Sequence, residues 1–528
     1  MLNLAVILED TARRYPRKKA FTLDNSTLTY MEVNAWANRV AGGLQRLGVR
    51  PGEKVALCAP NVLEFPVIYY GILKAGAIVV PINVLLHSRE IVYHLTNSDA
   101  RTFFCFEGSP ESRLWAKAFD AFRQVEACSD FILIRQSALQ GPASTGIPMP
   151  ADLMTLDDLT ADVPDTFECQ PTGADDTAVI VYTSGTTGTG KGAELTHNNL
   201  FTNAVLSSDI LQSSRNDVQL AVLPLFHIFG MTVMMNAGIY RGLHNVLLTR
   251  FDAISVFRLF IQHEISIFAG VPTMYWGLLN CPDTQDIDKT LTGKLRLCVS
   301  GGSALPVAML SAFEKRFEVP ILEGYGMSEG SPVVTFNQLD IGRKPGSIGT
   351  PVWGVEVKVV DTEGREVPHG EKGELIYRGP NVMKGYFKDP DTTALTLRSR
   401  WLHSGDIAIM DADGFFFIVD RIKDIIIRGG INVYPREVEE VMIQHPSVSM
   451  VSVVGVSHEK WGEEIKAFVV LKVGMEIGEE ELITWTRDRV AAYKYPRRIQ
   501  FVVTLPMNAA GKILKQELRA VPPSIDQR

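Results

Sequence analysis

The sequence has 528 residues, 46% hydrophobic and 21% charged, with a formal net charge of −8. This length exceeds what one hydrophobic core supports, so we expect at least two domains. The acidic balance argues against a nucleic-acid-binding scaffold, which would present a basic face, and no nucleic-acid partner is expected.

The six cysteines are far apart and form no Cys-x-x-Cys pair, which argues against a zinc site or disulfide framework and favours a reducing cytoplasm. Residues 1–10 lack the basic and apolar segments of a secretory signal. The most membrane-like stretch, residues 65–86, contains Lys74 near its centre. A lysine there would cost a spanning helix about 3 kcal/mol, so we expect a buried helix and strand, and no integral membrane segment.

Short β-rich runs alternate with helical patterns along the first part of the chain. We expect helices at residues 32–47 and 64–74, and strands at 54–59, 77–81, 178–181, 218–223, 265–269 and 295–300. Alternation of this kind predicts mainly parallel sheets covered by helices.

A second pattern follows towards the carboxyl end. Residues 355–361 and 373–378, with the turn Glu363-Gly364 between them, predict antiparallel strands of a smaller barrel-like unit. A boundary is expected near residues 420–424, and a helix at 435–444 and a strand at 449–456 lie beyond it. We therefore expect a mixed α/β fold. It comprises a large N-terminal domain (1–420) of helix-covered β-sheets with the barrel-like unit, and a small α+β C-terminal domain (421–528) on a hinge.

The most informative segment is residues 182–192, Tyr-Thr-Ser-Gly-Thr-Thr-Gly-Thr-Gly-Lys-Gly, which follows the strand at 178–181. Glycines let backbone N–H groups close around phosphate oxygens, and the Ser and Thr hydroxyls add donors. Lys191 would neutralise the outer phosphates. A Walker A loop would need Ser or Thr after the lysine to hold Mg²⁺, and this chain has Gly192 instead.

This segment resembles the signature of the adenylate-forming superfamily, which includes acyl-CoA synthetases, aryl-CoA ligases, luciferases and peptide-synthetase adenylation domains. The family usually has Pro before the lysine, where this chain has Gly190. The residues in the loop that the resemblance assigns to ATP are Thr183, Ser184, Gly185, Thr186, Thr187, Gly188 and Lys191.

Further motifs follow in the family's order as far as Leu518. Residues 301–303 and 323–329 resemble the adenine and α-phosphate segments, and residues 401–406 resemble the Thr-Gly-Asp motif, with Ser404 in place of Thr. The resemblance assigns further nucleotide contacts to Gly302, Ser303, Glu323, Gly324, Tyr325, Gly326, Met327, Ser328, Asp406 and Arg421.

The resemblance also implies the catalytic groups. Residues 505–515 match the motif of the catalytic lysine, Lys512, although Ala510 replaces a frequent Ser. Glu329 is the expected Mg²⁺ carboxylate, together with Thr183, and His227 the residue at the mouth of the acid site. Lys423 occupies the hinge position, and Arg428-Gly429-Gly430 matches the loop that lines the pantetheine tunnel.

The implied activity is ATP-dependent ligation of a carboxylic acid to CoA through an acyl-adenylate, with ATP, Mg²⁺ and CoA required. The acid pocket is expected from residues 226–235, 268–276 and 330–337, which contain no Arg or Lys. This composition disfavours acids with a second charge, and a medium- or long-chain fatty acid is preferred over an aryl or arylpropenoic acid. The pocket residues named are Phe229, Met231, Met235 and Val333.

Several alternatives stay open. No Gly-Gly-x-Ser carrier site follows the last motif, so a free-standing ligase is expected rather than a peptide-synthetase module. A separate carrier protein as acceptor, luciferase-type oxidation and a homodimer all remain compatible with the sequence. A mechanical P-loop ATPase is disfavoured by Gly192, and a non-catalytic nucleotide-binding protein by the complete set of charged residues.

Overall fold

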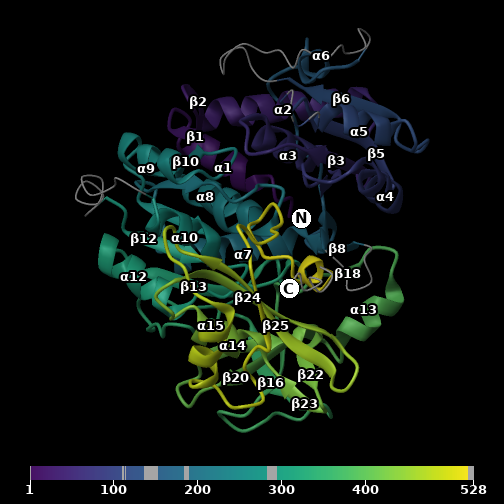
Figure 1. Cartoon of the computed structure of the whole chain (residues 1–528). Helices are drawn as coiled ribbons and strands as arrows, with labels where there is room; N and C mark the ends of the chain where they lie inside the picture. Colours follow the sequence, from purple (N-terminus) through teal and green to yellow (C-terminus); the bar gives the residue numbers. More distant parts are fainter. Residues whose placement is uncertain are drawn as a thin grey trace.

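The structure, a computed structural model, describes residues 2–109, 112, 114–135, 153–183, 190–281 and 294–520. Within these residues the strands form four sheets, of which two large ones belong to the first part of the chain (Figure 1).

A seven-stranded sheet supports one side of the large unit. Its order is β18-β8-β7-β4-β3-β5-β6, and it is parallel except where β8 pairs with β7 and β18. The strands are β3 Lys54–Cys58, β4 Ile78–Pro81, β5 Ala100–Phe106, β6 Asp130–Ile134, β7 Thr177–Thr183, β8 Lys191–Thr196 and β18 Gly385–Tyr386. The helices nearest in sequence are α2 Tyr30–Arg46, α3 Glu64–Lys74, α4 Ser88–Ser98, α5 Leu114–Phe122 and α6 Leu156–Thr160.

A nine-stranded sheet forms the other side, in the order β15-β14-β13-β12-β11-β9-β10-β1-β2, and is parallel from β13 to β1. Its strands are β1 Lys19–Leu23, β2 Ser26–Thr29, β9 Val218–Ala221, β10 His244–Leu247, β11 Ile267–Gly270, β12 Leu297–Ser300, β13 Ile321–Gly326, β14 Val333–Phe336 and β15 Thr350–Pro351. The helices of this part are α1 Val6–Arg14, α7 His197–Ile210, the π-helix η2 Phe229–Asn236, α8 Ala237–Arg241, α9 Ala253–Gln262, α10 Pro272–Leu279, α12 Val307–Phe317 and the 3₁₀ turn η3 Ser328–Gly330.

A five-stranded antiparallel sheet completes the large unit. It consists of β16 Glu356–Val360, β17 Gly373–Arg378, β19 Leu397–Arg398, β20 Trp401–Met410 and β21 Phe416–Arg421, with α13 Pro390–Thr396 beside it. The predicted hairpin is β16 paired with β17.

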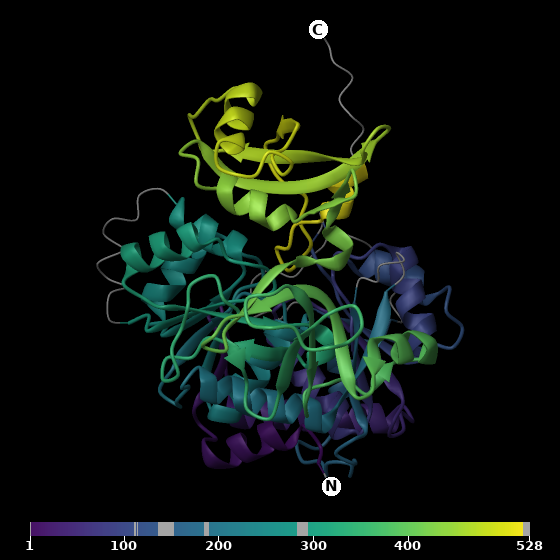
Figure 2. The same cartoon turned by 90° about the horizontal axis from the view of Figure 1, so that it is seen from below.

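The last part of the chain has a sheet and a hydrophobic core of its own. After the 3₁₀ turn η4 Ile422–Asp424 come β22 Ile426–Arg428, β23 Ile431–Val433, β24 Val448–His458, β25 Gly462–Leu471 and β26 Arg498–Phe501, with α14 Pro435–Met442, α15 Glu479–Arg487 and α16 Lys515–Ala520. Val438, Met442 and Leu482 pack against strand residues such as Ile465. Figure 2 shows this unit seated on the large one, with a loop descending between them.

The mixed α/β fold predicted from the sequence is confirmed. The helix predicted at 32–47 is α2, which begins where the side chain of Thr29 accepts from the backbone N–H of Glu32. The strands predicted at 218–223 and 265–269 are the shorter strands β9, which starts at the predicted residue, and β11, which starts two residues later.

The membrane-like stretch forms α3 and β4, and every residue of both is buried. Lys74 has no exposed side-chain surface, and its ammonium lies 2.5 Å from the Glu9 carboxylate of α1. Among the described residues we find no helix with the length and apolar run that a bilayer span needs. The lysine therefore joins two helices inside the large unit.

Removing the Glu9 charge should destabilise this unit, because it leaves a buried ammonium without its counter-ion. The Glu9 side chain is 36% exposed, so water relieves part of the loss and we expect Glu9→Gln to lower the free energy of unfolding by about 1–3 kcal/mol. Urea unfolding followed by circular dichroism measures this change. Asp10→Asn, which breaks surface pairs with Arg13 and Arg14, is the control and should cost less than about 1 kcal/mol. Equal midpoints for the two variants would contradict the prediction.

Candidate active site

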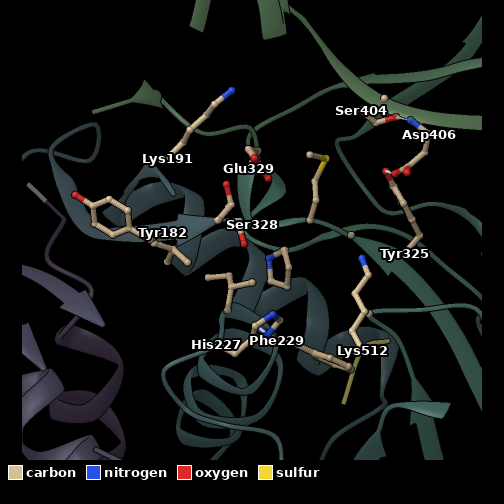
Figure 3. A pocket seen from close by; sticks show the side chains of 18 of the residues that line it. Tyr182, Lys191, His227, Phe229, Tyr325, Ser328, Glu329, Ser404, Asp406 and Lys512 are labelled. Atoms are coloured by element: carbon tan, nitrogen blue, oxygen red, sulfur yellow. Dashed lines mark hydrogen bonds between the residues drawn. The ribbon is translucent and has the colours of Figure 1, made fainter. Parts of the chain in front are cut away.

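A cavity of about 770 Å³ lies where the two large sheets, the small sheet and the C-terminal unit meet (Figure 3). Most of the residues predicted for the site line it, although they are up to 330 positions apart in the sequence. They are Thr183, Lys191, His227, Phe229, Gly302, Gly324, Tyr325, Gly326, Met327, Ser328, Glu329, Val333, Asp406, Arg421, Lys423 and Lys512.

The glycine-rich segment connects two antiparallel strands. Thr183 at the end of β7 is directly opposite Lys191 at the start of β8. A Walker A lysine would open a helix, so this hairpin agrees with the exclusion made from Gly192. Ser184, Gly185, Thr186, Thr187 and Gly188, predicted to bind phosphate, lie outside the described residues.

Lys191 and Glu329 approach each other through Tyr386. The Lys191 ammonium lies 5.5 Å from the centre of the Tyr386 ring, and the Tyr386 hydroxyl donates to Glu329 Oε1 at 2.7 Å. Glu329 is 6% exposed, and burial raises its pKa. A cation and a carboxylate thus both contact Tyr386, one at its ring and one at its hydroxyl, and both line the cavity.

The surroundings of Glu329 suit a magnesium ion bound to a nucleotide. The buried carboxylate of Glu329 faces the cavity, and desolvation of that carboxylate would be relieved by a cation. No group of three or more His, Cys, Asp or Glu side chains suited to a metal occurs among the residues described.

Asp406 is the centre of a second network, drawn in Figure 3. Its Oδ2 accepts from the Tyr325 hydroxyl at 2.5 Å, and its Oδ1 lies 3.1 Å from Arg421 Nε. Its backbone N–H donates to Ser404 Oγ, which donates to Leu375 O. A carboxylate has about four lone pairs, so Asp406 is fixed in place and still able to accept from a ligand's hydroxyls.

Lys512 enters the cavity on a turn of the C-terminal unit. Asn508 Oδ1 accepts from the backbone N–H groups of Ala510 and Lys512 at 3.0 and 2.9 Å, and Thr273 Oγ1 of α10 donates to Gly511 O at 3.2 Å. Gly511 has φ +76°, and a Cβ there would lie 2.7 Å from Thr273 Oγ1, so only glycine fits. The turn therefore docks tightly on the large unit.

The surroundings of Lys512 change its acidity. Burial, with a further contribution from the charge of Arg421, lowers its pKa to about 8. Burial also lowers the pKa of His227 to about 4, helped by the nearby Lys512. At neutral pH the cavity thus holds an ammonium next to a neutral imidazole.

The loop that carries His227 is anchored from the opposite sheet. Asn61 accepts from the backbone N–H of Leu225 at 2.8 Å and donates to the carbonyls of Ala221 and Leu223 at 3.0 Å. At only 2% exposed, Asn61 joins the end of β9 to the β3–α3 connection. This fixes the position of the following π-helix, on which Phe229 faces the cavity.

Four predicted residues do not reach the cavity. Met231 and Met235 pack in the core beside the seven-stranded sheet, because they lie on the opposite face of η2 from Phe229 and Val233. Ser303 is exposed beyond the turn at Gly302. Glu323 is a buried residue of β13 whose carboxylate accepts from the Gly346 N–H at 2.8 Å, and burial raises its pKa to about 7.

The predicted thiol-tunnel loop also lies away from the cavity. Arg428 pairs with Glu464 at 2.6 Å, and Gly429 and Gly430 form the turn between β22 and β23 with φ of +58° and +81°. Lys423 in η4 does line the cavity. In this arrangement the C-terminal unit presents Lys512, not the glycine turn, to the site.

Sequence reasoning missed several lining residues, among them Asn83, Glu90, His94, Tyr386 and Asn508. Asn508 could have been found, since an Asn side chain in a turn commonly accepts from the backbone N–H two residues further on, here that of Ala510. Tyr386 could not, because β18 joins β8 across some 190 intervening residues.

Comparison with known proteins agrees with the geometry. The pattern of the family described as "AMP-binding enzyme" matches residues 8–387, and that of the "AMP-binding enzyme C-terminal domain" matches residues 437–512. A long-chain-fatty-acid–CoA ligase of Bacillus subtilis (strain 168) is 36% identical over 98% of this chain and 94% of the relative. A feruloyl-CoA synthase of an Amycolatopsis species is 36% identical over 96% of both chains.

Among solved structures, an anthranilate CoA ligase in complex with anthranoyl-AMP superposes with a TM-score of 0.88 at 30% identity, covering 98% of this chain and 96% of the other. The predicted resemblance is thereby confirmed over nearly the whole length. The chain belongs to the AMP-binding enzyme family and is an AMP-forming acid–CoA ligase that uses ATP and CoA.

Proposed function

We propose that this ligase activates a medium- or long-chain fatty acid, with Lys512 as the cation that joins acid and nucleotide. The observation that carries the catalytic part is the position of Lys512 in one cavity with Lys191, Glu329 and Asp406. The acid specificity is supported by the apolar end of that cavity and by the relatives named as long-chain-fatty-acid–CoA ligases.

The first step joins two anions, a carboxylate and the α-phosphate of ATP. Their repulsion must be screened and the reacting atoms held in line, so the protein contributes charge and position rather than a nucleophile. Lys512 bridges the carboxylate and an α-phosphate oxygen, and Lys191 stabilises the departing pyrophosphate. Asp406 accepts from the ribose hydroxyls, and Tyr325 provides a ring face for the base.

Glu329, with Thr183, would hold Mg²⁺, which would neutralise phosphate charge. Tyr386 keeps the Glu329 carboxylate turned toward the phosphates through its hydroxyl. His227, uncharged at neutral pH, closes the acid site without adding a competing cation.

The second step requires a thiol to reach the acyl carbon. We propose that residues 421–528 turn about Lys423 once the acyl-adenylate has formed, withdrawing Lys512 and presenting Arg428, Gly429 and Gly430 to the CoA arm. The contacts to be broken include Thr273 to Gly511, the Trp276 indole N–H to Ser449 Oγ at 2.8 Å, and the ion pair of Lys372 with Glu437 at 2.8 Å. A cytoplasmic location and a homodimer are part of the same proposal.

The acid end of the cavity supports an apolar substrate. Among the described residues, the segments expected to bind the acid contribute no Asp, Glu, Lys or Arg to the cavity lining; their lining residues are Phe226, His227, Ile228, Phe229, Val233, Pro332, Val333 and Phe336. The second candidate is an aryl or arylpropenoic acid, which the feruloyl-CoA synthase and the benzoate and anthranilate CoA ligases among the similar proteins favour.

A panel of acids decides between these candidates. Initial rates of AMP formation should be highest with a fatty acid of eight or more carbons, because its chain removes apolar surface from water at about 25 cal/mol per Å². A dicarboxylic acid of equal length should lose at least about 100-fold in kcat/KM, because its second charge finds no partner. A preference for ferulate or benzoate would establish the second candidate instead.

Replacing the ammonium of Lys512 should separate the two half-reactions. Lys512→Ala should lower the rate of acid-dependent pyrophosphate–ATP exchange by about 10²–10³-fold, the loss typical of one transition-state donor. Thioester formation from synthetic acyl-adenylate and CoA should stay within about three-fold. Lys515→Ala is a matched control, because Lys515 pairs with Glu439 at 2.8 Å instead of lining the cavity. Equal loss of both half-reactions would exclude the assigned role.

The pH profile tests the same cation. Since the pKa of Lys512 is lowered to about 8, the ammonium is present below that pH and is lost above it. The kcat/KM for the acid, which reports the free enzyme, should therefore fall about ten-fold per pH unit above about 8. Lys512→Arg stays protonated and should lose this alkaline limb, even if its absolute rate is low. An identical limb in both proteins would assign it to another group.

A further inference from the structure

Helix α4 packs against both ends of the phosphate-binding hairpin. The Tyr93 hydroxyl donates to Gly190 O at 2.8 Å, at the end that leads into Lys191. The Tyr182 hydroxyl donates to Asn97 Oδ1 at 2.6 Å, at the other end. Tyr93 and Asn97 are four residues apart and so lie on one face of α4.

His94 occupies the space between these two contacts. Its ring stacks on Tyr182 with centroids 4.2 Å apart and planes inclined by 15°. Burial lowers its pKa to about 4, so the ring is neutral at physiological pH and packs as a flat, uncharged surface. Three side chains of α4 therefore contact the base of the hairpin: Tyr93, His94 and Asn97.

Gly190 is one of the positions at which the chain departs from the family's pattern, which has Pro before the lysine. Proline would fix φ near −65°, whereas glycine leaves the backbone far freer. A Cβ at Gly190 would lie 3.3 Å from Thr183 O and 3.4 Å from His94 Nε2, so the site is tight but not closed to a side chain. Some other contact must restrain the peptide that precedes Lys191.

We propose that Tyr93 is a positioning residue for Lys191, its hydroxyl bond to Gly190 O replacing the restraint that proline supplies elsewhere in the family. The carbonyl of Gly190 belongs to the peptide bond that carries the Lys191 nitrogen, so holding this oxygen orients the start of β8. The Lys191 ammonium then reaches the Tyr386 ring, and Tyr386 reaches Glu329.

This inference rests on the proposed role of Lys191 at the outer phosphates of ATP. The Tyr93 hydroxyl donates to a backbone carbonyl, and its effect on ATP passes through the Gly190–Lys191 peptide. Loss of the hydroxyl should weaken ATP binding and leave binding of the acid and the thioester step unchanged.

The first experiment compares Tyr93→Phe with wild type in acid-dependent pyrophosphate–ATP exchange. Deleting one hydrogen bond should raise KM for ATP by about 3- to 10-fold, with KM for the acid and the thioester rate from synthetic acyl-adenylate within two-fold. Tyr240→Phe is the matched control, since Tyr240 packs against Phe201 outside the cavity lining. An unchanged KM for ATP in Tyr93→Phe would overturn the inference.

The second experiment tests the replacement of proline directly. Gly190→Pro restores the family's residue, and in that background Tyr93→Phe should raise KM for ATP by less than about two-fold. Gly190→Ala provides the same comparison if the proline variant does not fold, because alanine also narrows the backbone's freedom. An equal cost of Tyr93→Phe in all backgrounds would refute the proposed compensation.

The proposed function can fail separately. If Lys191→Ala leaves KM for ATP unchanged, the role of Lys191 itself is wrong. If Lys191→Ala raises KM for ATP and Tyr93→Phe does not, the lysine assignment stands and only the role of Tyr93 is refuted.

Discussion

The arrangement of this enzyme depends on one ammonium group brought out of water. Lys512 sits on a turn of the C-terminal unit, yet its ammonium lines a cavity shared with the large unit and with the guanidinium of Arg421, and the proposed mechanism uses its charge there. Burial and that neighbouring charge lower its pKa to about 8, which is a measure of how unfavourable the site is for a cation without anions beside it. The contact between Thr273 and Gly511 holds the lysine there despite this unfavourable electrostatic environment. Two bound anions would make the environment more favourable for the ammonium.

Two carboxylates of the cavity, unlike the Lys512 ammonium, are already held by polar partners. Asp406 is held by Tyr325 and Arg421, and Glu329 by Tyr386, so neither has to reorganise when a nucleotide enters. Fixed polar groups of this kind stabilise developing charge more effectively than mobile water does. The partners come from strands β13, β18 and β20 and from the end of β21, which explains why the small sheet is attached to the two large ones at this point.

Local sequence patterns were sufficient to predict many of the helices and strands. The helix predicted at 64–74 is α3 with the same bounds, whereas nothing local in the glycine- and hydroxyl-rich segment 182–192 shows that β8 pairs with β7. The lining of the expected acid pocket was harder to predict. Met231 and Met235 are apolar, as Phe229 and Val233 are, and differ from them in the face of η2 that they occupy. Tyr386 and His94 could not be predicted at all, since their contacts join elements far apart in the sequence and depend on the tertiary fold.

Two of the departures from the family's pattern leave the local hydrogen bonds intact. Ser404, in place of Thr, still donates to Leu375 O and accepts from the Asp406 N–H, so the hydroxyl is kept and only a methyl group is lost. Ala510, in place of Ser, contributes its N–H to Asn508, which any residue but proline can do. Gly190 differs from both, because proline acts through φ and no other residue reproduces that restraint. A compensating contact is therefore required at Gly190 alone, and that is the carbonyl to which Tyr93 donates.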